Sequence, residues 1–231
     1  MGKKGIVGVV LVGTLSLFVG LGAFAGNATD DYAFNYEECD HVDHDATGRD
    51  LKPVIYLYPT EDNTEISVSL DYDGNLVELI PEFNAENTWN VTANTDGRIT
   101  FEGQEYDYLF WEGDPDFSYD FFSGFCVAGQ DTEAFLDEKL HALGLNDTET
   151  EEFMEFWLPM MQDNPYNMIS FQTDSYTNGA RLSVSPEPDS VIRVFMAWYP
   201  TDKFVKINPQ YIEGADRSGF TVVEWGGNKV K

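Results

Sequence analysis

Glu112 and Glu224 are the residues whose type and setting best suit acid–base chemistry. Each stands at the end of an apolar, strand-like run and directly beside a tryptophan, Trp111 or Trp225. Glycosidases pair two carboxylates, one as the acid and the other as nucleophile or base, and an apolar setting raises the pKa of the acid. Glutamate is common in this chain, so chance placement beside tryptophan is the alternative.

Geometry separates these two interpretations. A retaining pair needs its carboxyl groups about 5–5.5 Å apart and an inverting pair about 6.5–9.5 Å, with both groups lining one open cleft. We expect Glu112 and Glu224 to fail this test, because their strands belong to different halves of the chain and nothing in the sequence ties the strand ends together.

A short acidic segment carries two of the three histidines. His41 and His44 stand there with Asp43 and Asp45, and His-x-x-His with carboxylates suits Zn²⁺ or Ni²⁺. The spacing from Asp43 also copies the first half of a calcium loop, but Val54 stands where the bidentate glutamate belongs. The segment therefore predicts at most a weak divalent-cation site, with a solvated acidic linker as the alternative. No other cofactor is indicated, because no nucleotide or phosphate fingerprint is present.

The two cysteines, Cys39 and Cys126, both follow the N-terminal apolar run. An even number of cysteines in an exported chain predicts a Cys39–Cys126 disulfide, with two free thiols as the alternative. His41 lies near Cys39, but the acidic neighbours of this cysteine disfavour the thiolate that a Cys–His nucleophile requires.

Residues 1–25 form a separate targeting segment. Lys3 and Lys4 precede an uncharged apolar run that ends in Ala23-Phe24-Ala25, which is typical of a signal peptide. The run is also long enough to span a bilayer, so residues 5–25 as an uncleaved membrane anchor are the alternative. The start of this segment further resembles the processing site of type IV pilin-like proteins, although Val10 stands where bacterial pilins carry glutamate. Each interpretation places the bulk of the chain outside the cytoplasm, extracellular or at the cell surface.

Composition excludes some partners. The 231 residues include 13 Lys and Arg against 41 Asp and Glu, which gives a formal net charge of −28. Nucleic-acid binding depends on Lys and Arg displacing counterions from phosphates, so this acidic chain is not expected to bind nucleic acid. A hydrophobic fraction of 42% nevertheless predicts a folded core.

The pattern predicts an α+β protein in two parts. Residues 26–51 are predicted to form an acidic linker, and residues 52–113 a small antiparallel β-sandwich. In the second segment, short alternating runs such as Ile66, Val68 and Leu70 are separated by turn signals at Asp73-Gly74 and Asp96-Gly97. Residues 124–231 read as an α+β domain with a helical hairpin and a mainly antiparallel sheet.

The helical hairpin of the second part has recognisable ends. Asn146 with Glu149 three residues later predicts a capping box, and Pro159 predicts a kink or an end in the second helix. After this hairpin, strands are expected at 168–173, 181–184, 191–199, 204–207 and 220–225.

Aromatic residues are densest at 106–125, where nine of twenty residues are Tyr, Phe or Trp. If these rings are exposed, they form a stacking platform for sugars, with the interleaved carboxylates binding hydroxyl groups. If they are buried, they form the contact between the two parts of the chain, which is the commoner role of such rings.

Several strings of the chain resemble an uncharacterised family of secreted and surface bacterial proteins. The strings are KPVIYLYP at 52–59, YLFWEG at 108–113, GFCV at 124–127, FWLP at 156–159, PDS at 188–190 and GFTVVEWGG at 219–227. The resemblance implies export and a single unit of conserved length, and it assigns no catalytic residue.

Two classes of function therefore compete. The first is a non-enzymatic cell-surface or extracellular binding module with a glycan or protein partner, which we favour because no catalytic constellation stands out. The second is a carbohydrate-active hydrolase that uses Glu112 and Glu224. A pilin-like filament subunit is a minor alternative.

Overall fold

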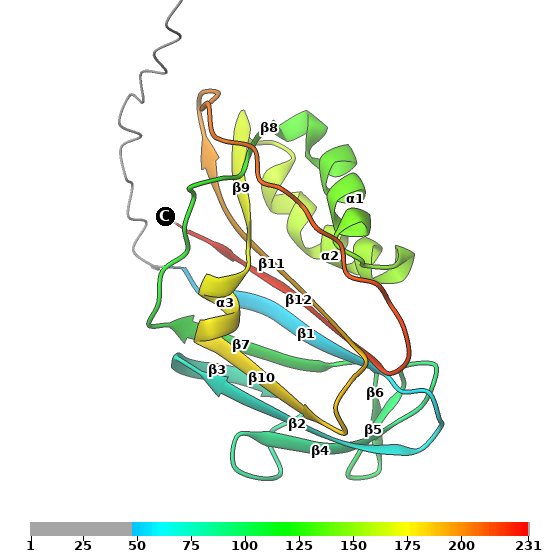
Figure 1. Cartoon of the computed structure of the whole chain (residues 1–231). Helices are drawn as coiled ribbons and strands as arrows, with labels where there is room; N and C mark the ends of the chain where they lie inside the picture. The colour runs from blue at the N-terminus through cyan, green and yellow to red at the C-terminus, as the bar shows by residue number, and fades with distance from the viewer. Residues whose placement is uncertain (1–47, 231) are drawn as a thin grey trace, which may run out of the picture. The chain divides into compact units, whose positions relative to one another are not determined.

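The computed structural model describes residues 48–230, which Figure 1 shows in colour. They form two β-sheets and three α-helices, so the predicted α+β class is confirmed. The larger sheet has seven strands, in the order β3 (Gly74–Ile80), β7 (Leu109–Pro115), β1 (Asp50–Tyr58), β12 (Thr221–Lys229), β11 (Ser190–Thr201), β9 (Tyr166–Gln172) and β8 (Phe125–Ala128). Its neighbours are antiparallel except for β11 and β12, which run parallel.

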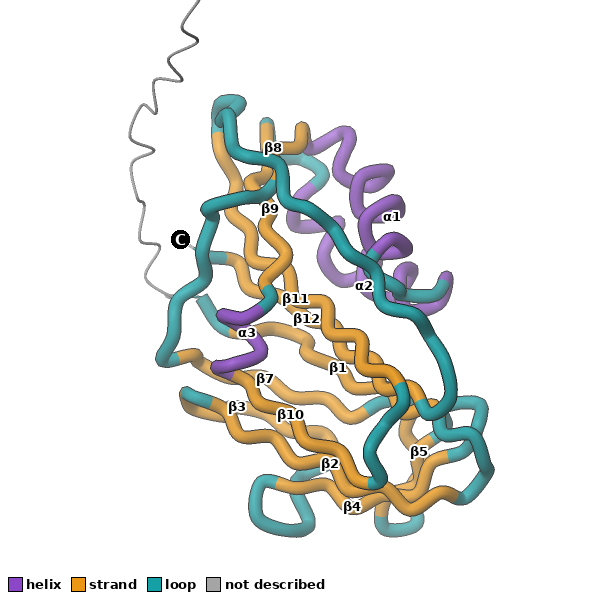
Figure 2. The backbone as a smooth tube through the Cα atoms, in the orientation of Figure 1, coloured by secondary structure: helices purple, strands orange, loops and turns teal. Residues whose placement is uncertain are grey.

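The smaller sheet has five strands and is antiparallel throughout. Its order is β10 (Ala180–Ser185), β2 (Thr64–Tyr72), β4 (Thr88–Ala93), β5 (Ile99–Phe101) and β6 (Gln104–Tyr106). In Figure 2 the smaller sheet lies at the bottom, against one face of the larger sheet. Helices α1 and α2 lie at the upper right, against the opposite face of the larger sheet.

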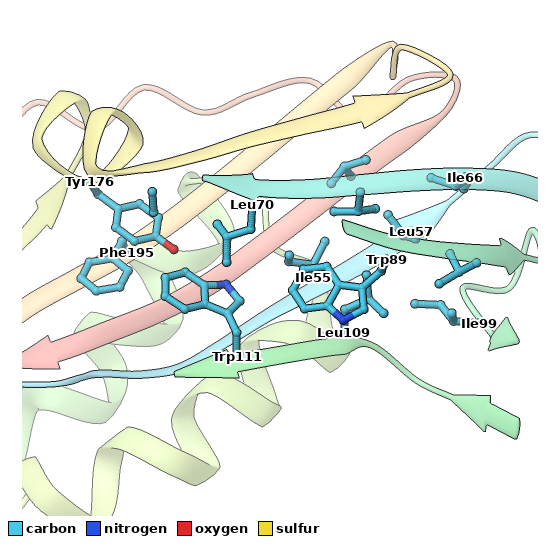
Figure 3. Packing of buried hydrophobic residues seen from close by; sticks show 14 of the residues in the cluster. Ile55, Leu57, Ile66, Leu70, Trp89, Ile99, Leu109, Trp111, Tyr176 and Phe195 are labelled. Atoms are coloured by element: carbon cyan, nitrogen blue, oxygen red, sulfur yellow. The ribbon is translucent and has the colours of Figure 1, made fainter. Parts of the chain in front are cut away.

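The two sheets bury an apolar core between them, which we call the inter-sheet core. The predicted alternation in β2 is confirmed, because Ile66, Val68 and Leu70 point inward and the residues between them face outward. Figure 3 shows side chains of the larger sheet, from β1, β7 and β11, and of helix α3 (Asp174–Gly179) packed against them. The largest buried residues of the inter-sheet core include Trp89, Trp111, Tyr176 and Phe195.

A second core, the helix-face core, lies under α1 (Thr132–Ala142) and α2 (Asp147–Met161). A short 3₁₀ turn, Gly129–Asp131, leads into α1. The predicted capping box is present at the start of α2, since the side chains of Asn146 and Glu149 each bind the other's backbone N–H. Pro159 does not end α2 at once, and the helix continues to Met161.

The predicted division into a sandwich at 52–113 and a separate domain at 124–231 needs correction. Strands from both segments are interleaved in both sheets: β1 lies between β7 and β12, and β10 pairs with β2 along its whole length. The described residues belong to one unit. Local turn signals could not reveal this arrangement, because the pairings join residues more than 100 positions apart.

Of the two predicted turns and the strand predicted at 204–207, only one turn is confirmed. Asp96-Gly97 does turn the chain between β4 and β5, with Gly97 at a φ of +87°. Asp73-Gly74 does not make a hairpin, because β2 and β3 belong to different sheets and the chain crosses between them there. The strand predicted at 204–207 is also wrong, since these residues lie in the loop between β11 and β12.

Gly226 explains why the first and last strands can pair at the centre of the larger sheet. β1 contains a bulge between Leu51 and Val54, and a Cβ atom on Gly226 would stand 2.9 Å from Cα of Pro53 in that bulge. The bulge therefore requires glycine opposite it. This contact links two of the strings quoted above, KPVIYLYP and GFTVVEWGG.

Replacing Gly226 with alanine should therefore destabilise the fold by about 2–3 kcal/mol, because the new methyl group meets backbone that cannot move freely. The control is Gly103→Ala in the β5–β6 turn, where a Cβ meets nothing within 4 Å and the only penalty is the φ of +82°, about 1 kcal/mol. Urea unfolding followed by tryptophan fluorescence measures both. A loss for Gly226→Ala no larger than that for Gly103→Ala would contradict the assignment.

Candidate functional site

The structure does not bring Glu112 and Glu224 together. β7 and β12 flank the same strand, β1, so the strand ends are tied more closely than the sequence suggested. Leu109 and Glu224 both stand opposite Ile55, whereas Phe110 stands opposite Val54. Side chains alternate along a strand, so Glu112, two residues after Phe110, lies on the helix side and Glu224 lies on the other face of the sheet.

Glu224 is wholly buried between the two sheets. Its carboxylate accepts a hydrogen bond from Nε of Arg193 and one from Nε1 of Trp111 at 3.3 Å. The Arg193 guanidinium lies over the ring of Tyr176, 4.8 Å from its centroid. Burial alone would lower the pKa of Arg193, but the charge of Glu224 raises it. This is a closed structural ion pair with no access for a substrate.

Glu112 is half-buried and faces the helix side of the sheet. Its Oε1 atom accepts the backbone N–H of Lys52 at 3.4 Å. Burial raises the pKa of its carboxyl group, and the neighbouring carboxylate of Glu78 raises it further, while Arg49 and Lys52 oppose the shift. Glu112 is therefore a partly desolvated acid whose neighbouring carboxylate on the same face is Glu78, directly opposite it on β3, and not Glu224.

Asp50 is a buried acid that the sequence analysis did not predict. Three donors bind its carboxylate: the hydroxyls of Tyr119 at 2.6 Å and Tyr72 at 2.7 Å, and Nδ2 of Asn228 at 2.8 Å. Burial nevertheless raises the pKa of Asp50 to about 6, because no cation among residues 48–230 forms an ion pair with it and the hydrogen bonds offset only part of the desolvation. Its position at the edge of an acidic stretch gave no signal of this role.

The outward face of the five-stranded sheet is hollowed, and we call this feature the outer-face concavity. It has a volume of about 690 Å³ and crosses β10, β2, β4 and β5. Its polar side chains lie in register on neighbouring strands, Ser67 opposite Asn90 and Glu65 opposite Thr92, which in turn faces Thr100. The side chains that line it include Glu65, Ser67, Asn90, Thr92, Thr100 and Glu102.

Hydrogen bonds fix the centre of this concavity. Ser67 donates from Oγ to Oδ1 of Asn90 at 2.7 Å. Asn84 holds the other side of Asn90, accepting its backbone N–H at 2.9 Å and its Nδ2 at 3.1 Å. The sequence signal was the outward half of the β2 alternation, where small hydroxyl residues stand at Ser67 and Ser69.

The aromatic stretch at 106–125 lies mainly in the two cores. Trp111 and Tyr119 are buried in the inter-sheet core, and Phe117 and Phe121 pack against it. Phe122 is the large exposed ring of the stretch, at 65%. The rings of the inter-sheet core form the contact between the sheets, and the stretch as a whole does not make one continuous stacking platform.

The remaining predicted residues lie mostly outside the described part of the chain. His41, Asp43, His44, Asp45 and Cys39 belong to residues 1–47, so the metal site and the disulfide stay predictions. Within residues 48–230, no group of three or more His, Cys, Asp or Glu side chains is placed to hold a metal ion. Cys126 is half-buried on β8, and its Sγ accepts the backbone N–H of Val205 at 3.2 Å.

Among residues 48–230, no helix has both the length and the apolar character needed to cross a bilayer.

Fold and surface together define an α+β protein of two stacked sheets, with helices on one outer face and a polar concavity on the other. A protein of Butyrivibrio fibrisolvens named "Uncharacterized protein in bglA 3'region" is 62% identical over 114 residues, which are 49% of this chain and 100% of that protein. The chain belongs to the same family as that protein. No family model matches the chain, and no solved structure matches it either.

Removing the charge of Glu224 should be far more damaging than removing that of Glu112. In Glu224→Gln, Arg193 keeps a buried charge without a counter-ion, which costs about 3–5 kcal/mol. Glu112→Gln, on a partly exposed side chain, should cost less than about 1 kcal/mol. Chemical denaturation measures both. The double variant Glu224→Leu with Arg193→Met should recover much of the loss, and equal losses in the two single variants would refute this difference.

Asp50 should make the stability of the protein pH-dependent. Because its pKa is about 6 in the folded state and 3.8 as the ordinary value, the folded state holds the proton more tightly. The stabilisation is complete below about pH 4 and is lost as the pH rises through 6, by roughly 3 kcal/mol in total. The difference in unfolding free energy between wild type and Asp50→Asn, measured from pH 4 to 7.5, should follow this course. A difference that stays constant over this range would contradict the assignment.

Proposed function

We propose that this protein is an exported, non-enzymatic binding module that holds an uncharged, hydroxyl-rich ligand, a neutral glycan, in the outer-face concavity. The observation that carries the proposal is the 690 Å³ hollow lined by hydroxyl, amide and carboxylate side chains on a rigid sheet. Sites on strands position their side chains more precisely than sites on loops.

The chemistry of the lining suits sugar hydroxyls. Each hydroxyl group of a sugar both donates and accepts hydrogen bonds, and Ser, Thr and Asn side chains do the same. Glu65 and Glu102 add carboxylates, which accept only. A ligand rich in hydroxyls can satisfy all these groups, whereas an apolar ligand would desolvate them without compensation.

Charge narrows the ligand class further. The residues that line the concavity include two glutamates and no Lys or Arg, and the whole chain carries −28. An anionic ligand would therefore meet like charge at long range and at the site. These features support a neutral ligand.

Preorganisation supports binding at this surface in particular. Asn84 and Ser67 hold Asn90 in one orientation before any ligand arrives, so binding does not have to order this side chain. The alternative of a hydrolase that uses Glu112 and Glu224 gains no support from their positions on opposite faces of the sheet. Export remains part of the proposal on the strength of residues 1–25.

A matched pair of variants tests the site. Ser67→Tyr fills the concavity with a ring, while Ser183→Tyr puts the same ring on the same outward face of β10, outside the lining. Both positions lie on strands, where tyrosine is well tolerated. On affinity electrophoresis against a panel of neutral polysaccharides, wild type and Ser183→Tyr should be retarded equally and Ser67→Tyr at least tenfold less.

The protein for this experiment is best recovered from the medium or envelope of the producing cells, which also checks export. If wild type binds no neutral polysaccharide, or if Ser67→Tyr binds as well as wild type, the proposed function is wrong. Full-length protein confined to the cytosol would overturn the exported location.

A further inference from the structure

Lys52 has a backbone conformation that its sequence position opposes. Its φ is +58°, in the left-handed region, which costs a non-glycine residue roughly 1–2 kcal/mol. The next residue is Pro53, and a residue before proline strongly prefers an extended conformation. Such a conformation persists only where the surroundings impose it, and it is a reason to look for a function.

The surroundings that impose it are visible. Lys52 lies in the one-residue bulge of β1, and its backbone N–H is bound by Glu112. Pro53 fills the space that the missing side chain of Gly226 leaves. Bulges redirect side chains and are common beside binding sites. Here the bulge directs the Lys52 side chain across the helix side of the sheet.

The Lys52 ammonium group lies among aromatic rings. Nζ donates to the hydroxyl of Tyr108 at 3.1 Å and lies 5.0, 5.9 and 6.0 Å from the ring centroids of Tyr108, Phe110 and Trp225. All five arginines among residues 48–230 form ion pairs, but half-buried Lys52 forms none with any carboxylate of this part of the chain. Two of its N–H donors are therefore available to an anion.

Two of the three rings beside Lys52, those of Tyr108 and Phe110, are only partly buried, whereas Trp225 is wholly buried. The helix-face core takes its buried strand residues from β1, β9, β11 and β12, while half-buried Phe110 on β7 and Tyr108 just before this strand only pack against it. The next strand, β3, places Ile80 directly opposite Phe110, and Ile80 is 46% exposed. An apolar strip from Phe110 to Ile80 thus lies open beside the ammonium group, with Glu112 and Glu78 paired along its side.

We infer that Lys52, Tyr108 and Phe110 form a second binding site, for a carboxylated sugar such as a uronic acid residue. The ligand carboxylate binds the Lys52 ammonium group, and the C–H face of the sugar packs on the Phe110 ring. Glu112 accepts hydrogen bonds from the sugar hydroxyl groups. A single negative charge matches the single cation. A dianion such as phosphate meets two carboxylates and the acidic field of the protein. This site is independent of the outer-face concavity.

Isothermal titration of the full chain with aldotriouronic acid, a trisaccharide that carries one uronic acid residue, tests the inference, with its methyl ester as the uncharged probe. Lys52→Met keeps the apolar stem and the same backbone requirement while losing the charge, so binding should weaken at least tenfold. Lys52→Arg should stay within threefold of wild type. Lys229→Met, which removes a lysine lying over Trp198, should change nothing.

A second variant covers the case in which Lys52→Met does not fold. Ile80→Glu adds a negative charge at an exposed position beside Phe110 and should also weaken binding of aldotriouronic acid at least tenfold. Ser67→Tyr should leave it unchanged, which separates this site from the concavity. The inference fails if wild type does not bind aldotriouronic acid, if the methyl ester binds equally well, or if folded Lys52→Met or Ile80→Glu binds as wild type does.

Discussion

The buried pair of Glu224 and Arg193 sets the condition that the rest of this fold has to meet. A carboxylate without solvent contact is tolerated only with a close counter-charge and further hydrogen bonds, and here the partners come from separate elements: Arg193 from β11, Trp111 from β7 and Tyr176 from α3. The parallel register of β11 and β12 places Arg193 directly opposite Glu224. The charge is therefore satisfied only when β7, β11 and β12 are assembled in the larger sheet and α3 packs over Arg193, which couples distant parts of the chain.

Local features of the fold could be predicted because their causes are local. The outward and inward residues of β2 alternate in the sequence as they do in the structure, and the capping box of Asn146 and Glu149 needs only four residues. Strand pairing could not be predicted in the same way. Asp73-Gly74 carries the chemistry of a hairpin turn, yet β2 pairs with β10 and β4, because burial of Ile66, Val68 and Leu70 against the larger sheet decides its neighbours.

The same limit applies to the candidate sites. Glu112 and Glu224 look alike in sequence, each beside a tryptophan, and only the register with β1 shows that one is a core ion-pair partner and the other is half-exposed. Ser67 was visible as an outward residue, but the register that sets it beside Asn90 was not. Lys52 shows the strongest conflict, since its sequence context favours an extended backbone. Its own bond to Glu112 and the packing of Pro53 against Gly226 impose the opposite.

The closeness of the two ends of the folded unit has a mechanical consequence. β1 and β12 are antiparallel neighbours, and Asn228 binds the backbone of Gly48 at 3.1 Å and the side chain of Asp50 at 2.8 Å. Tension applied between residues 48 and 230 would act on this strand pair from one end, so its hydrogen bonds would break in sequence, as in a zipper. The pair would thus open one hydrogen bond at a time, which makes the two ends of the folded unit its weak point under tension.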